Sequence, residues 1–308
     1  MTFLKNNVTA RSAALGGAFI GLSNDASTLF YNPAGLMNLK GKNLVASHNM
    51  YVADIQYSFI GLTYSLSKFN AAVGLQMAYL TTGSMDETTP FDPLGTGRTF
   101  GAGNTLFGLT YAQTLTPKFS VGFTTKLLIE NLADERVFAG AGDVGTYYNT
   151  EWKSLVFGMS VRNFGTNYKY SNDEIPLPML FVFGIGFEPY KDETNKFVAL
   201  VEAAHPSDNS EYLTIGIEYS YDNMFYIRTG RKIDNDEYWI LKNEVNLPPD
   251  ESPDGELYTS QTGINWTGTG IGMGFKLERH WGFSIDYALY NMGYLGMSHM
   301  ITFNINPN

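Results

Sequence analysis

Short segments in which large apolar side chains alternate with small or polar ones follow one another from about Asn43 to the end of the chain. The clearest of them spans residues 281–289. Its odd positions are Trp281, Phe283, Ile285, Tyr287 and Leu289, and its even positions are Gly282, Ser284, Asp286 and Ala288. Because successive side chains of a strand point to opposite faces, each segment predicts a strand with one apolar face and one small or polar face.

We predict fourteen such strands from this pattern. They lie near residues 43–51, 54–66, 68–82, 103–115, 118–131, 138–149, 152–164, 178–188, 195–204, 210–221, 223–232, 267–278, 281–291 and 294–305. Twelve or sixteen strands also fit, because the connection at 51–54 is very short.

Composition favours a transmembrane barrel over a soluble sandwich, which would show the same alternation. Charged residues make up 16% of the chain, against about a quarter in soluble domains. Aromatic residues make up 15% and recur near strand ends, while the opposite face is rich in glycine and serine. No stretch approaches the length of about 18 apolar residues that a membrane helix requires. The expected fold class is all-β: a transmembrane antiparallel β-barrel of about 14 strands.

The connections between the predicted strands alternate in length. Those near 66–68, 115–118, 149–152, 221–223 and 278–281 are tight, whereas 83–102, 165–177 and 233–266 are long and polar. Short turns on one side and long loops on the other are typical of bacterial outer-membrane barrels. An even number of strands places both termini at the end of the barrel with the short turns, which is the periplasmic side. We therefore expect the outer membrane as the location and its lipid as a partner. The start MTFLKNN has no apolar signal core, so we expect the signal peptide to have been removed.

The longest loop is strongly acidic, with eight acidic residues and one lysine between Ile233 and Leu257. Hard cations bind clustered carboxylates, but no ligand-like spacing is present, so we expect a solvated loop and no metal. Four consecutive residues in this loop form a candidate protein-contact patch, and packing onto the barrel rim is the equal alternative. They are Tyr238, Trp239, Ile240 and Leu241.

The sequence carries no recognisable catalytic set. Its four histidines are scattered, and Ser298 and His299 are strand neighbours that face opposite sides. The glycines at 272 and 274 lie inside a predicted strand with no helix after it, which is unlike a phosphate loop. The chain has no cysteine, and its net charge of −10 argues against nucleic acid. We expect no enzymatic activity and no cofactor.

The residues before the first strand have a different character. Residues 10–36 are rich in glycine and alanine and end in Asn32-Pro33-Ala34-Gly35. A barrel of about 14 strands encloses a lumen that its own side chains do not fill. A disordered tail is the alternative, but it would leave apolar residues such as Leu15 and Phe19 in water. We therefore predict a hatch of residues 1–42 that plugs a barrel formed by residues 43–308.

The alternation of side chains along the predicted strands also places charged residues in the lumen. They are Lys126, Glu130, Arg162, Glu218, Arg228, Lys276 and Asp286. Charges of both signs can pair across the lumen or bind the hatch. We expect one pair between Asp25 of the hatch and Arg228; pairing among the strand residues or with water is the alternative.

At the hatch the sequence resembles a known family. FLKNNVTARSAALGGAFIGLSNDASTLFYNPAGL, residues 3–36, closely resembles the start of mature PorV/PorQ-family outer-membrane proteins, which are also catalogued as an uncharacterised protein family of spirochaetes. The part from Asn24-Asp25 to Asn32-Pro33-Ala34-Gly35 is also similar to the hatch of the FadL group of long-chain fatty-acid transporters. The resemblance implies a 14-stranded barrel with an N-terminal hatch in a Gram-negative-type outer membrane, with Asp25 and residues 32–35 as hatch architecture.

The resemblance implies two different functions. For PorV it implies a component of the type IX secretion system, with the translocon barrel and the C-terminal domains of cargo as partners. For the FadL group it implies passive transport of hydrophobic molecules such as fatty acids. The chain is shorter than typical PorV proteins. Residues 69–79 contain one glycine and no proline, which predicts an unbroken wall where the transporters have a kinked strand, and this mildly favours the secretion component. We expect secretion as the function and hydrophobic transport as the alternative.

Overall fold

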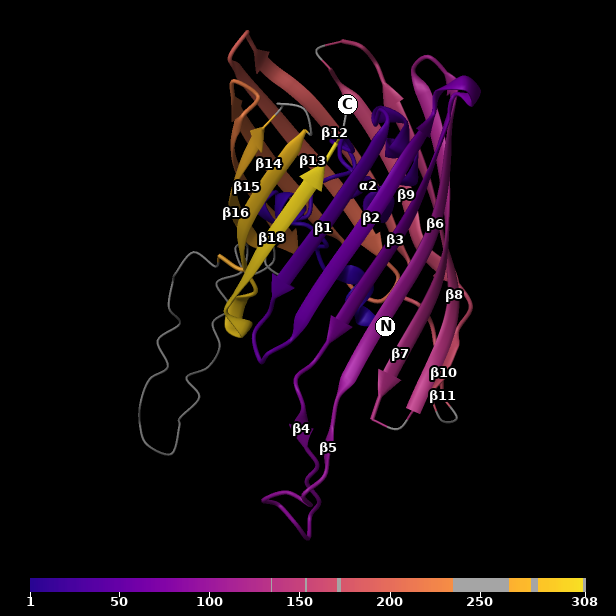
Figure 1. Cartoon of the computed structure of the whole chain (residues 1–308), viewed down its shortest axis with the longest axis vertical. Coiled ribbons are helices and arrows are strands. Elements are labelled where there is room, and N and C mark those ends of the chain that lie inside the picture. Colours follow the sequence, from indigo (N-terminus) through magenta and orange to yellow (C-terminus); the bar gives the residue numbers. More distant parts are fainter. Residues whose placement is uncertain (134, 153, 171–172, 235–265, 278–281, 307–308) are drawn as a thin grey trace, which may run out of the picture.

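In the computed structural model, fourteen antiparallel strands close into a barrel, as expected (Figure 1). The structure describes all residues except 134, 153, 171–172, 235–265, 278–281 and 307–308. β1 pairs with β2 on one side and with β18 on the other, so that the described sheet has no free edge. The barrel strands are β1 (Lys42–Met50), β2 (Gln56–Leu66), β3 (Ala71–Thr81), β6 (Ala102–Thr116), β7 (Phe119–Leu132), β8 (Glu135–Asn149), β9 (Val156–Gly165), β12 (Leu180–Lys191), β13 (Asn195–Pro206), β14 (Tyr212–Tyr221), β15 (Phe225–Asp234), β16 (Thr269–Leu277), β17 (Phe283–Asn291) and β18 (Met297–Ile305).

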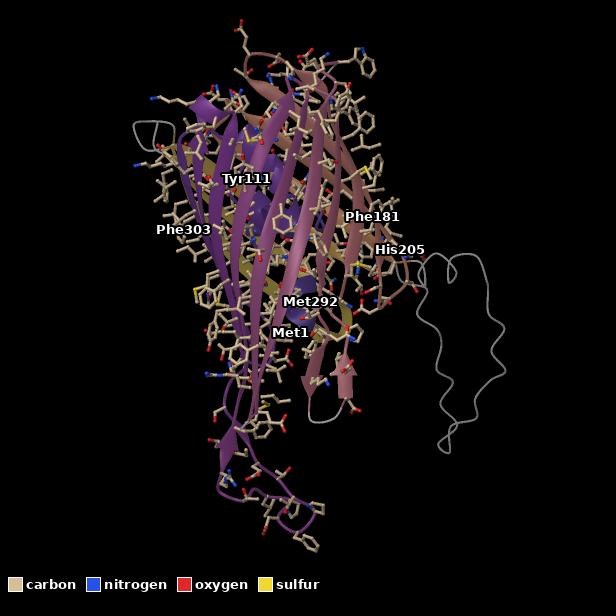
Figure 2. All side chains as sticks on the ribbon, turned by 90° about the vertical axis from the view of Figure 1, so that its right-hand side faces the viewer. Met1, Tyr111, Phe181, His205, Met292 and Phe303 are labelled. Atoms are coloured by element: carbon tan, nitrogen blue, oxygen red, sulfur yellow. The ribbon has the colours of Figure 1, made fainter. Side chains whose placement is uncertain are left out.

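The outer face of the barrel is apolar over its height. Alternate strand residues such as Leu75, Leu109 and Met273 are more than half exposed, while their neighbours in the chain face the lumen. Figure 2 shows these side chains standing off the wall, among them Tyr111, Phe181 and Phe303. Such a continuous apolar band would be unfavourable in water and is typical of strands that cross a bilayer. None of the helices in the described residues is long and apolar enough to cross a membrane.

The two ends of the barrel differ. At one end, tight connections join β2 to β3 through η3 (Ser67–Phe69), β6 to β7, and β14 to β15, and we name it the short-turn end. At the other, the long-loop end, two hairpins extend the connections after β3 and β9, where the sequence predicted only long polar loops (Figure 1). They consist of β4 (Met85–Asp86) with β5 (Thr99–Phe100), and β10 (Tyr168–Tyr170) with β11 (Asp173–Ile175). The connection from β17 to β18 contains η4 (Gly293–Leu295).

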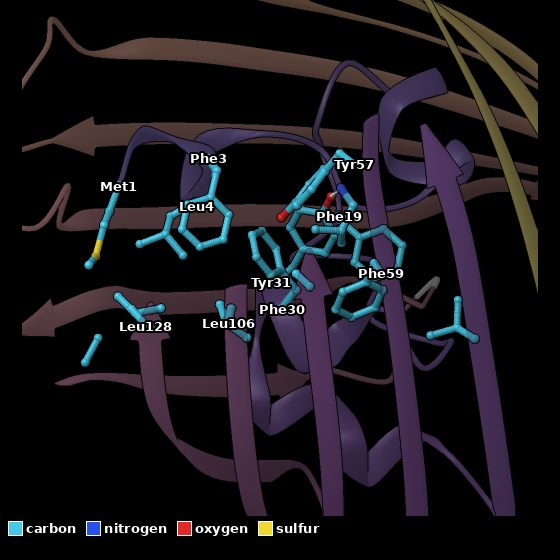
Figure 3. Packing of buried hydrophobic residues seen from close by; sticks show 14 of the residues in the cluster. Met1, Phe3, Leu4, Phe19, Phe30, Tyr31, Tyr57, Phe59, Leu106 and Leu128 are labelled. Atoms are coloured by element: carbon cyan, nitrogen blue, oxygen red, sulfur yellow. Dashed lines mark hydrogen bonds between the residues drawn. The ribbon is translucent and has the colours of Figure 1, made fainter. Parts of the chain in front are cut away.

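The residues before β1 fill the lumen as a hatch of short helical pieces. These are η1 (Thr2–Lys5), α1 (Ala10–Ala14), α2 (Thr28–Tyr31) and η2 (Pro33–Asn38). α1 ends early because Gly16 and Gly17 have φ of +69° and +100°, a conformation that favours glycine and stops a helix. Phe19, Phe30 and Tyr31 pack with Tyr57 and Phe59 of β2 in the main apolar cluster (Figure 3).

The hatch backbone packs directly against glycines of the barrel wall. A Cβ added at Gly230 would collide with the backbone of Leu15, one at Gly270 with the carbonyl of Ala13, and one at Gly122 with the backbone of Pro33. The small inner face that the sequence shows is therefore the surface on which the hatch backbone rests.

Candidate functional site

Within the part of the chain that the structure describes, the hatch leaves a cavity toward each end of the lumen. The outer cavity has a volume of about 260 Å³ and lies toward the long-loop end. Its lining is mixed: apolar and aromatic residues such as Phe30, Leu180 and Met300 alternate with polar and charged ones such as Asn49 and Arg162. The inner cavity, of about 250 Å³, lies toward the short-turn end and is lined mainly by polar and charged residues.

An irregularity in strand β9 places two successive side chains in the outer cavity. The register between β8 and β9 shifts by one residue opposite Asp143, so that Arg162 and Asn163 are both buried in the lumen. Asn163 has φ of +60°, which asparagine tolerates better than most residues. An extra residue in one strand is a recognised way to redirect a side chain at a functional site. Arg162 faces the lumen by the regular alternation of β9, and the bulge turns Asn163 to the same side.

Hydrogen bonds hold this bulge in place. The backbone N–H of Asn163 donates to Asp143 Oδ1 at 2.8 Å, and its side-chain amide donates to the carbonyl of Pro178 at 3.2 Å. Lys126 Nζ donates to Asn163 Oδ1 at 2.8 Å and forms an ion pair of 2.6 Å with Asp143. Because every charge in this cluster is paired, its role is to position the bulge.

Among the described residues, the guanidinium of Arg162 has no hydrogen bond or ion pair, although Glu202 attracts its charge. It lies 5.9 Å from the ring centre of Phe30 and 5.6 Å from that of Tyr31, both residues of the hatch. The residue is 9% exposed, and its Nε is buried without a hydrogen-bond acceptor. A buried donor without an acceptor is costly, and arginine is suited to bind carboxylate or phosphate in a planar, bidentate manner. Arg162 can therefore receive an anionic or hydrogen-bond-accepting group from the cavity.

The other charges around the outer cavity are already engaged. Glu202 accepts hydrogen bonds from the backbone N–H groups of Phe19, at 2.5 Å, and of Ile20, which fixes the hatch to β13. Lys232 pairs with Asp234 at 3.0 Å and lies 4.2 Å from the ring centre of Tyr212. Lys5 pairs with Asp208 at 2.6 Å. Arg162 thus differs from these three residues in having unused hydrogen-bonding capacity.

A buried ion network links the hatch to the wall beside the inner cavity. Arg11 of α1 donates to both oxygens of Glu218 at 2.8 and 2.7 Å and pairs with Asp25 at 2.8 Å. Arg228 donates to Glu218 at 2.5 Å and to Asp286 at 2.6 Å. Burial would lower the pKa of Arg11, but the carboxylates of Glu218 and Asp25 outweigh it and raise the pKa above its usual value. We name these five residues the ion network.

The ion network corrects one prediction from the sequence. We expected Asp25 to pair with Arg228, but Arg11 and Glu218 lie between them, and Asp25 binds Arg11 instead. Parity correctly placed Glu218, Arg228 and Asp286 in the lumen, because all three are buried there. The prediction failed because a cation of the hatch itself satisfies Asp25.

The hatch motif lies against the wall. The Asn32 amide donates to the carbonyl of Thr146 at 3.0 Å and accepts from the N–H of Ala34 at 3.2 Å. Pro33 begins η2, and Gly35 packs closely against Thr28 and Ser23. None of residues 32–35 lines the two cavities, whereas Asp25 lines the inner one. A role in hatch architecture remains the prediction for these residues.

Sequence reasoning missed Arg11, Asp143 and Glu202. Glu202 had a visible signal, because it is the only charge in the apolar run 197–204. Asp143 occupies a position that the alternation of its strand turns inward. Arg11 gave no such signal, because it lies in a segment without regular periodicity. The predicted contact patch, Tyr238, Trp239, Ile240 and Leu241, lies outside the described residues. Within the described part of the chain, no group of three or more histidine or acidic side chains is arranged to hold a metal.

Comparisons with known proteins agree with this architecture. The model of an uncharacterised protein family, UPF0164, matches residues 4–107, which form most of the hatch and the first strands. No curated protein matches the chain. The solved structure of the toluene transporter TodX of Pseudomonas putida is similar, with a TM-score of 0.61 at 11% identity over 97% of this chain and 96% of TodX.

Two further solved structures share the fold. The toluene transporter TbuX of Ralstonia pickettii has a TM-score of 0.57 at 10% identity, covering 98% of this chain and 99% of TbuX. A FadL homologue of Pseudomonas aeruginosa has a TM-score of 0.56 at 10% identity, covering 98% of both chains. The expected likeness to the FadL group is thereby confirmed at the level of the fold.

Proposed function

We propose that this chain is a passive channel for hydrophobic small molecules in a bacterial outer membrane. The observation that carries the proposal is the outer cavity, which combines apolar and aromatic side chains with one buried guanidinium, Arg162, whose Nε has no acceptor among the described residues. TodX and TbuX, which share the fold, are toluene transporters. The apolar outer face supports a membrane location, and by the usual arrangement of such barrels the long-loop end faces the exterior.

The geometry favours ligands with an apolar body and an anionic head. The cavity is close to the lower end of small-molecule sites, which span about 300–1,000 Å³. Apolar and aromatic residues such as Leu180 and Tyr212 receive the body of the ligand. Arg162 binds its carboxylate, which supplies the acceptor that the buried Nε lacks. A fatty acid has this chemistry, and toluene lacks the anionic head.

Binding of a matched pair of ligands to the protein in lipid nanodiscs tests this function. Decanoate and decanol have the same chain length and differ in charge. Loss of a hydrogen bond to a charged group costs about 1.5–3 kcal/mol. We therefore expect Arg162→Gln to weaken decanoate binding roughly ten- to hundredfold. Decanol binding should change little.

The control is Lys118→Gln, which removes a positive charge from an exposed ion pair with Glu151 at the short-turn end. It should leave both affinities at their wild-type values. Equal weakening of decanoate and decanol by Arg162→Gln would show that the variant only disturbs packing. Unchanged decanoate binding would remove Arg162 from the site, and the absence of binding by either ligand to the wild type would refute the channel.

A component of type IX secretion is the second candidate. The observation that favours it is a closed wall: β3 pairs residue by residue with β2 and β6 without a register shift, as the sequence predicted. The tip between β4 and β5 also exposes Phe91 and Leu94 almost completely, as an unpaired apolar surface. Such a tip suits contact with the translocon barrel or with cargo C-terminal domains.

Extraction from native outer membranes and mass spectrometry of the proteins that co-purify test this second candidate. Co-purification of a large barrel or of secreted proteins with a shared C-terminal domain would support the secretion role, provided that the substitutions Phe91→Ser and Leu94→Ser abolish this co-purification. The matched control is Phe69→Ser, an exposed apolar residue at the opposite end. Isolation of the chain without either class of protein would count against the secretion role.

A further inference from the structure

A second buried polar side chain, Asn49 of β1, borders the outer cavity on the side of the lumen away from Arg162. We propose that Asn49 binds a hydroxyl group at the far end of the ligand, so that the site selects hydroxylated carboxylic acids with an apolar body. This inference rests on the proposed channel function and narrows the class of ligand that the channel carries.

Asn49 has unused hydrogen-bonding capacity. Among the described side chains that line the outer cavity, only those of Arg162 and Asn49 carry buried polar atoms without a hydrogen-bond partner. Asn49 is 2% exposed, and both its amide nitrogen and its amide oxygen lack a partner. Tyr51 lies close enough to interact with this amide, but not in the geometry of a hydrogen bond. Because buried polar atoms without partners are costly, the amide favours a ligand that supplies the missing contacts.

Asn49 lies across the lumen from Arg162. The regular alternation of β1 turns Asn49 inward, as it does Asn43 and Ser47. In the order of the closed sheet, five strands separate β1 from β9 in one direction and seven in the other. Both residues nevertheless line the same cavity. A ligand that contacts both of them must therefore span the cavity and carry its two polar groups at opposite ends.

Tyr31 of the hatch supplies apolar surface between these two sides. Its ring centre lies 5.6 Å from the guanidinium carbon of Arg162, and it also lies near Tyr51 on the side of Asn49. The Tyr31 hydroxyl is already engaged, because it accepts from the N–H of Val8 at 3.0 Å and contacts the Ser12 hydroxyl at 2.5 Å. Tyr31 therefore presents mainly its ring, which suits the apolar body of the ligand.

The chemistry of an amide identifies the second polar group of the ligand. The amide nitrogen of Asn49 donates and its oxygen accepts, and a hydroxyl can complement both because it is a donor and an acceptor. A second carboxylate would only accept, and an ammonium group would only donate. A charge would also be buried without compensation, because the residues paired with Asn49 on the adjacent strands, Tyr57 and Met300, are uncharged. A hydroxyl is therefore the group that fits.

The same strand offers a matched control for Asn49. Asn43 also faces inward and is buried, but its amide donates to the carbonyl of Lys40 and to the Thr63 hydroxyl, each at 3.1 Å. It borders the inner cavity and not the outer one. Leucine has the branched outline of asparagine without its hydrogen-bonding atoms. The variants Asn49→Leu and Asn43→Leu thus make the same chemical change at an unpaired and at a paired position.

Binding of paired acids to the protein in lipid nanodiscs tests the inference. Each pair consists of an alkanoate and its ω-hydroxy derivative, in a series of lengths from hexanoate to dodecanoate. At the length that spans the cavity, we expect the wild type to bind the hydroxy acid roughly two- to tenfold more tightly, as expected for one net hydrogen bond. Asn49→Leu should abolish or reverse this preference, because the hydroxyl would then be buried without a partner. Arg162→Gln should weaken both acids alike.

Thermal denaturation separates a binding role of Asn49 from a structural one. Asn43→Leu should lower Tm, because two hydrogen bonds are lost, and should keep the wild-type preference for the hydroxy acid. Asn49→Leu should leave Tm at or above the wild-type value. A decrease in Tm as large as that of Asn43→Leu would assign Asn49 to structure and overturn the inference. Asn49→Ala removes the same amide without added bulk and should also abolish the preference.

The affinities distinguish failure of this inference from failure of the channel. Equal affinity of the wild type for both members of every pair would mean that water satisfies Asn49, and would overturn the inference while the channel function stands. A preference that persists in Asn49→Leu and in Asn49→Ala would place the hydroxyl elsewhere and overturn it as well. If the wild type bound neither acid at any length, the proposed function would be refuted, and the inference with it.

Discussion

Replacement of Gly230 by alanine should release residues 10–17 of the hatch, which we name the α1 segment, while the barrel stays intact. The added methyl group would overlap the backbone of Leu15. Because the overlapping atoms belong to the backbone and not to a flexible side chain, a change of rotamer cannot relieve the overlap. Gly230 lies in a strand paired on both sides, so the wall is the more rigid partner. The hatch must therefore yield.

The size of the effect follows from what the segment loses. Overpacking in a well-packed interior costs about 1–3 kcal/mol. If α1 moves away instead, the burial of Leu15 is lost, which is worth about 1.5–3 kcal/mol for a fully buried aliphatic side chain. Either way, we expect the free energy of local opening to fall by about 1–3 kcal/mol, which corresponds to roughly 5- to 150-fold faster hydrogen exchange when exchange follows the open population.

Hydrogen exchange of residues 10–17, followed by mass spectrometry, measures this opening, and thermal denaturation reports on the barrel. The matched control is Gly140→Ala on β8, where an added Cβ would meet nothing within 4 Å. The control should exchange as the wild type does. Wild-type protection of the α1 segment in Gly230→Ala would refute the argument that the wall glycines are required for hatch docking.

Three further substitutions test the interior. Glu218→Gln should destabilise the protein by about 3–5 kcal/mol in chemical denaturation, because Arg11 and Arg228 lose their shared charge partner. Tyr31→Phe removes the hydroxyl that accepts from the N–H of Val8 and contacts Ser12, so exchange at Val8 should correspond to a loss of about 1–3 kcal/mol. Asn163→Ala should lower the free energy of unfolding by at least about 1 kcal/mol, because alanine disfavours φ of +60°. It should also weaken decanoate binding by displacing Arg162. Unchanged affinity for decanoate would show that the bulge does not contribute to the site.

The barrel was predictable because its signal is local and repeated. The two-residue alternation fixes which side chains face outward, and the observed strands agree with the predicted ones to within a few residues at most ends. A larger difference lies after Thr150, where the next strand begins at Val156 and not near 152. Glu151 and Ser154 have positive φ there, so the chain forms a longer turn than the alternation suggested.

The site was less predictable because it depends on contacts between distant parts of the chain. Alternation placed Arg162 in the lumen, but the sequence pattern shows neither the bulge that turns Asn163 inward nor that the Nε of Arg162 lacks an acceptor. Regular alternation would have turned either Arg162 or its neighbour Asn163 outward. Likewise, nothing in the hatch sequence shows that Arg11 meets Glu218, because that contact spans more than two hundred residues.

The hatch therefore has two halves with different physical properties. On the side of β2–β9, large rings such as Phe30 and Tyr57 interlock, and η2 packs against β6–β8. Displacing that half would expose buried aromatic surface, which is costly because each ring buries about 150–250 Å². On the side of β14–β18, the alanines of α1 rest on wall glycines between two cavities, Leu15 joins the main apolar cluster, and Arg11 pairs with Glu218. In the proposed channel, a ligand at Arg162 lies next to both halves, and the half on the side of β2–β9 is the costlier one to displace.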